Sequence, residues 1–382
     1  MSQPRNVLIL GASYGTLLAV KLLAAGHSVK LACLPAEAEL INAEGVRVRM
    51  PVKGRSDLVE VDSRRLPGAL SAAVPADIDP APFDLVVLAM QEPQYRAPAV
   101  RALLVRAAHA QRPCMSIMNM PPLSYLARIP GVDVAACRAC YTDASVWDAL
   151  DPALVTLCSP DPQAFRPPTE KTNVLQVRLP TNFKAARFAS DADTALLREL
   201  AAGIDAARFD IGGESLELPV KLRVHDSVFV PLAKWSMLLA GNYRCVGKDG
   251  MLSIRDAVHG DLDASRAVYE WVATLCKALG AAASDLVPFE KYANAALSLM
   301  SPSSAARALA AGATDIERID RLVQLLGQQK GMRSDAVDMV VSRVDAWLAR
   351  NRARAYAPRR RLGAMTDAHP PATSVLEAPF SG

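Results

Sequence analysis

The chain lacks any long uninterrupted hydrophobic run, which limits the class of protein it can be. Its apolar runs, such as Leu85–Met90, are short beside the roughly 20 residues that a helix needs to cross a bilayer. The opening Met1–Asn6 leads directly into a strand-like run, without the charged, apolar and small-residue zones of a secretion signal. We therefore expect no membrane span and, by default, a cytoplasmic location.

An excess of charge of one sign is also lacking. Lys and Arg number 43 against 39 Asp and Glu, a net charge of +4. Residues 350–382, with six arginines against two acidic residues, carry this excess, so the remaining body is neutral. A neutral body that is 51% hydrophobic can build large cores, which excludes a wholly disordered chain. The charge predicts no nucleic-acid partner.

Cysteine is sparse, odd in number and scattered. Seven residues cannot form a complete disulfide framework. Cys137 and Cys140 form a lone C-x-x-C pair, whereas zinc normally requires a second pair or histidines at close spacing. The five histidines are dispersed, so no metal site is expected.

What the chain does contain is a pattern of alternating strands and helices in its first half. An aliphatic strand at 5–10, a glycine turn, a helix at 16–25 and a strand at 27–33 form a predicted βαβ unit of a parallel sheet. Further elements in this half are strands at 45–51, 83–90 and 114–118, a helix at 98–110, a surface loop at 64–82, and an antiparallel extension at 135–177.

Helical periodicity dominates the second half. The predicted helices cover 191–208, 228–246, 262–279, 287–300, 315–328 and 334–350. The sequence thus predicts an α/β Rossmann-type dinucleotide-binding domain over residues 1–185 and a mostly α-helical C-terminal domain over 186–350. A disordered tail is expected over 351–382.

The glycine turn is the first candidate functional motif, and it allows three interpretations. Gly11 ends the first strand and Gly15 opens the helix, so backbone N–H groups can approach a pyrophosphate at the positive helix end. The turn does not fit G-x-G-x-x-G fully, because Ser13 stands at the middle glycine. The turn also matches G-x-S-x-G, which would make Ser13 the nucleophile of an α/β-hydrolase. In that fold the motif follows a central strand with other strands before it, whereas only ten residues precede this turn. The third interpretation is a simple tight turn.

The order of features resembles the ketopantoate reductase (2-dehydropantoate 2-reductase) family. The opening βαβ unit and the strand at Phe83–Met90 resemble that family, as does Met115–Met120, which carries Asn119. Pro231–Lys234 resembles the start of the family's catalytic-lysine helix, with Asn242 eight residues further on. Ser303-Ser304 followed by Thr314-Asp315-Ile316 resembles its Ser…Thr-Glu-Ile pattern.

The resemblance implies an NADP-dependent reductase, NAD not being excluded, that converts a 2-oxo acid to a 2-hydroxy acid. It implies that Lys234 is the proton donor, that Asn119 and Asn242 orient the substrate, and that Ser303 and Asp315 bind it. The cofactor-binding residues it implies are Gly11, Ala12, Ser13, Tyr14, Gly15, Thr16 and Gln91. The chain departs from the family at Leu238, where a second asparagine is usual, and at Leu34 and Gln91, where basic residues are usual.

The chemistry of Lys234 supports this role independently. Hydride addition to a carbonyl leaves negative charge on oxygen, which a nearby ammonium can stabilise and protonate. The alternative is an ordinary surface lysine whose stem covers Trp235.

Two other functions remain open: an opine-dehydrogenase-like imine reductase, which would use His225 and Asp226, and a non-catalytic nucleotide-sensing protein. Long apolar helices in the second half are compatible with a homodimer.

Overall fold

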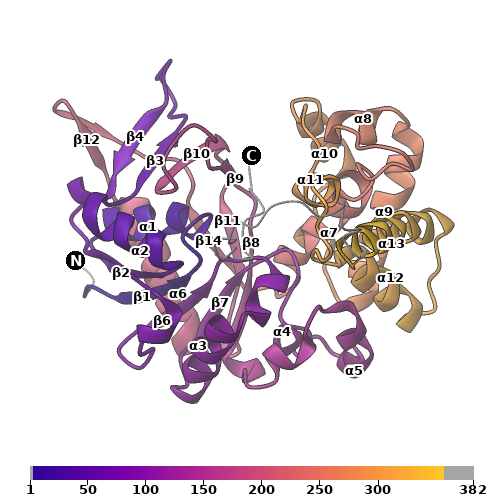
Figure 1. Cartoon of the computed structure of the whole chain (residues 1–382), viewed down its shortest axis with the longest axis horizontal. Helices are drawn as coiled ribbons and strands as arrows, with labels where there is room; N and C mark the ends of the chain where they lie inside the picture. Colours follow the sequence, from indigo (N-terminus) through magenta and orange to yellow (C-terminus); the bar gives the residue numbers. More distant parts are fainter. Residues whose placement is uncertain (1–2, 357–382) are drawn as a thin grey trace, which may run out of the picture.

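Strands and helices alternate through the chain as far as residue 225, and the named elements that follow it in the described residues are helical (Figure 1). The computed structural model describes residues 3–356. The predicted Rossmann-like sheet followed by a helical part is therefore confirmed. No helix within the described residues is both long and apolar enough to span a membrane.

An eight-stranded sheet lies at the centre of the N-terminal part, in the order β14-β11-β8-β7-β6-β1-β2-β5. Its strands are β1 (Asn6–Leu10), β2 (Ser28–Ala32), β5 (Leu70–Ala73), β6 (Leu85–Leu88), β7 (Cys114–Ile117), β8 (Val155–Ser159), β11 (Phe183–Ala186) and β14 (Leu222–His225). All neighbouring strands run parallel except β8 and β11.

Helices cover both faces of this sheet, which explains why β1 is an unbroken apolar run. Ile9 shares a core with helices α1 (Gly15–Ala24), α2 (Pro35–Glu44) and α6 (Asp191–Ala206). Leu8, its neighbour in the strand, points to the opposite face and shares a core with α3 (Pro98–His109). Both side chains are fully buried.

A smaller sheet and a hairpin extend from the same part of the molecule. The smaller sheet has the order β4-β3-β10-β9, and the hairpin pairs β12 with β13. Their strands are β3 (Arg47–Met50), β4 (Val59–Asp62), β9 (Gln163–Phe165), β10 (Val174–Leu179), β12 (Phe209–Ile211) and β13 (Glu214–Leu216).

The helical part packs against the α3 face of the main sheet, since one continuous core includes both. The remaining helices are α4 (Leu123–Leu126), α5 (Val134–Cys137), α7 (Lys234–Met237), α8 (Ile254–His259), α9 (Leu262–Leu279), α10 (Phe289–Ala296), α11 (Ser304–Ala310), α12 (Ile319–Gln329) and α13 (Asp335–Tyr356). Helix α9 has the predicted bounds because Asp261 accepts a hydrogen bond from the Ala264 N–H at its start and Gly280, at φ +122°, ends it.

The N-terminal strands differ from the prediction in three ways. The stretch 64–82, predicted to be a surface loop, contains β5, which pairs in parallel with β2 at the sheet edge. Its short Leu-Ser-Ala-Ala sequence has no strand pattern, so only the pairing makes it a strand. Within the predicted antiparallel extension, β8 runs parallel to β7, although β8 pairs antiparallel with β11 and β9 pairs antiparallel with β10. The main sheet also continues past residue 185, because β14 pairs with β11.

Two helix predictions also need correction. The predicted helix at 228–246 is divided into a 3₁₀ turn at Val230–Ala233, helix α7, and a π-helical turn at Leu238–Asn242. In that turn the Tyr243 N–H donates to the Leu238 carbonyl five residues back. Helix α13 continues into the predicted disordered tail as far as Tyr356, because Asn351 donates to the carbonyls of Leu309 and Ala313. Residues 357–382 lie outside the described residues.

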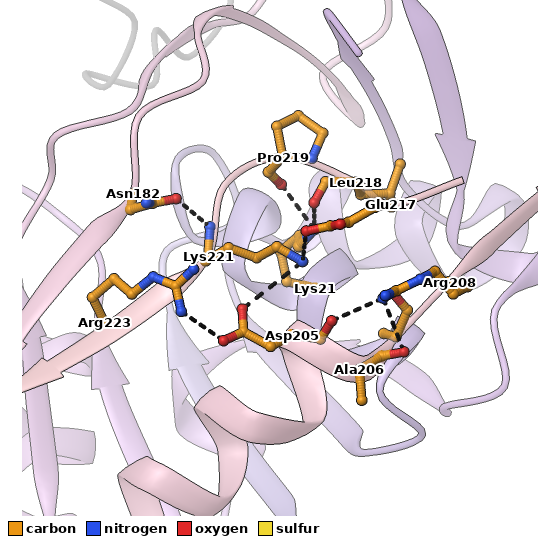
Figure 2. Close-up of polar contacts among 11 residues, drawn as sticks. Lys21, Asn182, Asp205, Ala206, Arg208, Glu217, Leu218, Pro219, Lys221 and Arg223 are labelled. Atoms are coloured by element: carbon orange, nitrogen blue, oxygen red, sulfur yellow. Dashed lines mark hydrogen bonds and ion pairs between the residues drawn. The ribbon is translucent and has the colours of Figure 1, made fainter. Parts of the chain in front are cut away.

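A buried lysine in α1 ties this helix to the segment before β14 (Figure 2). Lys21 is 2% exposed, and its Nζ donates to the carbonyls of Leu218 at 3.1 Å and Pro219 at 2.8 Å. Burial, together with the nearby Lys221 ammonium, lowers the pKa of Lys21 to about 7. The folded protein therefore favours a neutral amine here, whereas the unfolded chain favours the ammonium.

This preference predicts a pH-dependent cost of folding. Below pH 7 the folded state must bury the Lys21 ammonium; the cost falls as the pH rises from about 7 towards 10.5 and is absent above it. Lys21→Met removes the titrating group. The free energy of unfolding of this variant should therefore rise relative to that of wild type as the pH is lowered through this window, by the order of a few kcal/mol. Urea unfolding at several pH values measures the difference. Lys53→Met, at an exposed turn, is the control, and a difference that is independent of pH in Lys21→Met would contradict the assignment.

Candidate active site

The glycine turn after β1 forms the first part of the site. Gly11 adopts φ +110°, and a Cβ there would lie 2.6 Å from Met90 Cγ and 2.9 Å from the Ala89 carbonyl oxygen. A side chain at Gly11 is thus excluded by both backbone conformation and space. The close approach keeps the turn directly above the carboxyl ends of β1 and β6.

Gly15 is required for a different reason. A Cβ at Gly15 would lie 2.6 Å from Ile9 Cγ2 and 3.1 Å from Ala89 Cβ. These atoms belong to the sheet, so Gly15 allows α1 to pack closely on the strands, as the third glycine of the dinucleotide motif does.

The turn leaves backbone donors available at the positive end of α1. Within the described residues, nothing accepts a hydrogen bond from the N–H groups of Ala12, Ser13 and Tyr14. The Thr16 hydroxyl donates back to the Ala12 carbonyl and closes the turn. Unpaired N–H groups at a helix N-terminus suit a pyrophosphate, so these residues fit a dinucleotide.

The segment 160–166, which follows β8, lies against this turn. The Tyr14 hydroxyl donates to the Pro162 carbonyl at 2.7 Å, and its ring packs edge-on against Phe183. Two residues earlier, the Pro160 carbonyl accepts a hydrogen bond from Lys234 Nζ. The 160–166 segment therefore links the glycine turn to the predicted proton donor.

Lys234 is a largely buried side chain, 20% exposed. Its Nζ lies 3.7 Å from Asp161 Oδ1, and Lys184 binds the other carboxylate oxygen at 2.9 Å. Burial lowers the pKa of Lys234 below its usual value, whereas Asp161 and Glu317 partly restore it. The alternative of an ordinary exposed lysine does not describe this environment.

A small open cavity lies next to the π-helical turn that follows α7, and Lys234 itself is not among its lining residues. It joins a residue after β7, the π-helical turn that follows α7, and α11. Its lining residues are Gln91, Asn119, Leu238, Asn242, Tyr243, Ser304, Ala305, Ala308, Ile316 and Glu317. The structure thus brings Asn119, Asn242 and Gln91 together, and Leu238 gives the wall an apolar patch.

Glu317 is a lining residue that the sequence did not reveal. It is 8% exposed; Oε1 accepts from the Glu92 N–H at 3.3 Å and Oε2 accepts from Asn119 Nδ2 at 3.4 Å. Burial raises the pKa of Glu317 to about 7, although the hydrogen bonds from the Glu92 N–H and from Asn119 lower it, so near neutral pH the carboxyl is partly protonated. The only available signal was its position two residues after Asp315.

Ser303 and Asp315 do not line the cavity. The Ser303 hydroxyl donates to the Asn242 carbonyl at 2.6 Å and accepts from the Ala306 N–H as the N-cap of α11. Asp315 forms ion pairs with Arg96 and Arg352, each at 3.0 Å. Both residues are therefore bound to other groups of the chain.

The alternative catalytic pairs are not assembled. Asp226 pairs with Arg198 at 2.5 Å, and no hydrogen bond joins it to His225 within the described residues. Ser13 is exposed, and the hydrogen bonds of the described residues join no histidine to it. The geometry favours neither the opine-type pair nor the hydrolase elbow.

Comparisons with known proteins identify the fold. No protein-family model matches the chain, and no curated protein sequence matches it either. Among solved structures, 2-dehydropantoate 2-reductase from Methylococcus capsulatus has a TM-score of 0.62 at 16% identity, covering 91% of this chain and 97% of its own. The probable 2-dehydropantoate 2-reductase of Bacillus subtilis has 0.56 at 13%, covering 90% and 99%.

A D-mandelate dehydrogenase solved with NADH and anilino(oxo)acetate gives a TM-score of 0.60 at 13% identity, covering 91% of this chain and 99% of its own. The predicted resemblance to ketopantoate reductases is thus confirmed for the fold. At these identities the likeness extends to the fold alone.

The packing at Gly15 makes a testable prediction. Gly15→Ala should lower the free energy of unfolding by about 1–3 kcal/mol, because its Cβ would overlap Ile9 and Ala89. Thermal or urea unfolding measures this loss. Gly250→Ala, where a Cβ meets nothing within 4 Å, should leave stability nearly unchanged. Equal stability of the two variants would show that α1 does not pack as described.

Proposed function

We propose that this chain is a nicotinamide-dependent reductase that converts a 2-oxo acid to a 2-hydroxy acid. The observation that carries the proposal is a largely buried lysine, Lys234, that lies one helical turn before Leu238 in the wall of an amide-lined cavity and is joined to a dinucleotide-type glycine turn by the 160–166 segment. The fold shared with ketopantoate reductases and with a D-mandelate dehydrogenase that binds NADH supports it.

Each residue of the candidate site would have its own role in the reaction. The reduced nicotinamide, when bound, supplies the hydride. Lys234 releases the Pro160 carbonyl, donates a hydrogen bond to the substrate's oxo oxygen and protonates the alkoxide that develops there. Asn119 and Asn242 donate amide hydrogens that orient the substrate. Burial lowers the pKa of Lys234, and Asp161 opposes this by favouring the ammonium form.

The cavity wall favours a substrate with an apolar side chain. Leu238, Ile316 and Ala308 offer no hydrogen bond, and Leu238 replaces the amide that ketopantoate reductases usually have there. Glu317 takes the place that the resemblance gave to Asp315, as a group that hydrogen-bonds a polar end of the substrate. Ser303 acts through Asn242 by holding its carbonyl.

The homodimer and the cytoplasmic location stay predictions that the sequence supports.

Turnover of 2-oxo acids tests the proposal directly. The purified protein should oxidise NADPH or NADH with at least one member of a panel of apolar 2-oxo acids that includes ketopantoate. Lys234→Met should lower kcat by about 100- to 10,000-fold, the range for loss of a general acid, with cofactor affinity unchanged. Lys277→Met, on an exposed position of α9, is the matched control. No turnover by wild type on any panel member, with cofactor bound, would overturn the reductase assignment.

The pH profile tests the role of Lys234 in the same assay. Only the ammonium form can donate a proton, so kcat should fall as the pH rises through the lowered pKa of Lys234. Because Asp161 raises this pKa, Asp161→Asn should move the alkaline fall to lower pH. Asp79→Asn, at an exposed turn, should leave it in place. An unchanged alkaline limb in Asp161→Asn would exclude Lys234 as the titrating donor.

A further inference from the structure

A tyrosine hydroxyl outside the cavity is bonded to the helix that forms part of the cavity wall. Tyr292 belongs to α10, is 6% exposed and is not among the residues that line the cavity. Its hydroxyl donates a hydrogen bond to the Met237 carbonyl at 3.1 Å. Met237 is the last residue of α7, directly before the π-helical turn at Leu238–Asn242. Tyr292 therefore contacts the cavity wall without reaching into the cavity.

The π-helical turn determines how the residues on either side of it are oriented. Hydrogen bonds between residues five apart insert one residue into the helix, which rotates the residues that follow by about 100° relative to an unbroken α-helix. Lys234 lies before this turn and Asn242 is its last residue. The direction of the Asn242 side chain relative to Lys234 therefore depends on the turn. Such turns are rare, so we looked for the groups that hold this one.

Gly241, within the turn, leaves the space that the Tyr292 hydroxyl occupies. A Cβ on Gly241 would lie 1.9 Å from Tyr292 Oη and 3.2 Å from Tyr292 Cζ. Insertion of a side chain beside the helical hydrogen bonds is a known cause of a break in helical geometry. The hydroxyl and the turn thus fit each other only because position 241 has no side chain.

Two other hydroxyl groups hold the far end of the turn. The Ser303 hydroxyl donates to the Asn242 carbonyl at 2.6 Å. The hydroxyl of Tyr243, the next residue, donates to the backbone carbonyl of Glu317. Tyr292 supplies the matching contact at the start of the turn. The backbone on which Asn242 stands is therefore held at both ends by side chains from other helices or segments.

The Tyr292 ring is itself held in place. It stacks on Tyr269 of α9, with the ring centroids 5.5 Å apart and the planes at 21°. Tyr269 packs edge-on against Phe289, and its own hydroxyl donates to the Val287 carbonyl at 2.8 Å. A hydroxyl on a packed ring keeps its acceptor in one position, as a supporting group of a preorganised site must do.

We propose that Tyr292 is a positioning residue for the 2-oxo acid: its hydroxyl fixes the π-helical turn, and the turn holds the Asn242 amide at the cavity. This inference rests on the proposed function. Tyr292 acts through the backbone of the turn and contacts neither Lys234 nor the glycine turn. Loss of its hydroxyl should therefore weaken substrate binding and leave proton donation and cofactor binding intact.

Steady-state kinetics of Tyr292→Phe test the role in substrate binding, using the 2-oxo acid of the panel that wild type reduces fastest. The substitution keeps the ring and removes only Oη. KM for the 2-oxo acid should rise about 2- to 10-fold, the range for one neutral hydrogen bond, whereas kcat and the KM for the cofactor should change little. Tyr269→Phe is the matched control, because it removes a hydroxyl from the stacked ring that is bound to Val287 instead of to the turn.

Hydrogen exchange of the backbone amides tests the contact with the turn without any turnover. The amides of residues 238–243 should exchange about 2- to 10-fold faster in Tyr292→Phe than in wild type, because the turn opens more easily without the hydroxyl. In Tyr269→Phe the same amides should exchange at the wild-type rate.

The outcomes separate this inference from the proposed function. Unchanged exchange of residues 238–243 in Tyr292→Phe, or the same increase in both tyrosine variants, would show that Tyr292 does not hold the turn, whether or not the protein is a reductase. Faster exchange without a rise in KM would overturn the positioning role and leave the proposed function standing. If wild type reduces no 2-oxo acid, the proposed function fails and the positioning role fails with it, whatever the exchange rates.

Discussion

The parallel pairing of β1 with β2 and β6 is the constraint on which the rest of the molecule depends. Because the hydrogen-bonded strands run in one direction, the turns that follow them all emerge at one edge of the sheet. The glycine turn, the Glu37 helix start and Gln91 therefore lie at the same edge. Gly11 and Gly15 allow the closest approach there, since neither position has room for a Cβ.

Buried charge is distributed along this edge in an ordered way. Lys234, Lys184 and Asp161 form a linked group at one end, and Arg166 and Glu37 form a pair at the other. Inside a protein, unpaired charges are costly, and each of these groups has a partner of opposite charge. Glu317 avoids the cost of a buried charge in another way, because its raised pKa allows the carboxyl to be neutral near pH 7.

Sequence patterns predicted the elements whose local signals were strong. The first βαβ unit, helix α9 and the apolar strand β6 were found because apolar periodicity, capping residues and glycines mark them. Strand β5 and the π-helical turn were missed, because neighbouring strands or packed helices impose them on sequences with little preference of their own. Asn119 and Asn242 line one cavity, whereas Ser303 and Asp315 are bound to other groups of the chain.

The sequence by itself determined the Rossmann-type beginning, the helical second half and a short set of polar candidates, because each depends on residues close together in the chain. Only the tertiary structure decided which candidates meet. It placed Glu317 in the cavity in preference to Asp315, bound Lys234 to Pro160, and carried Arg166 to the end of β2. These contacts join residues far apart in the sequence, and their partners are set by how the strands pair and the helices pack, which no local pattern records.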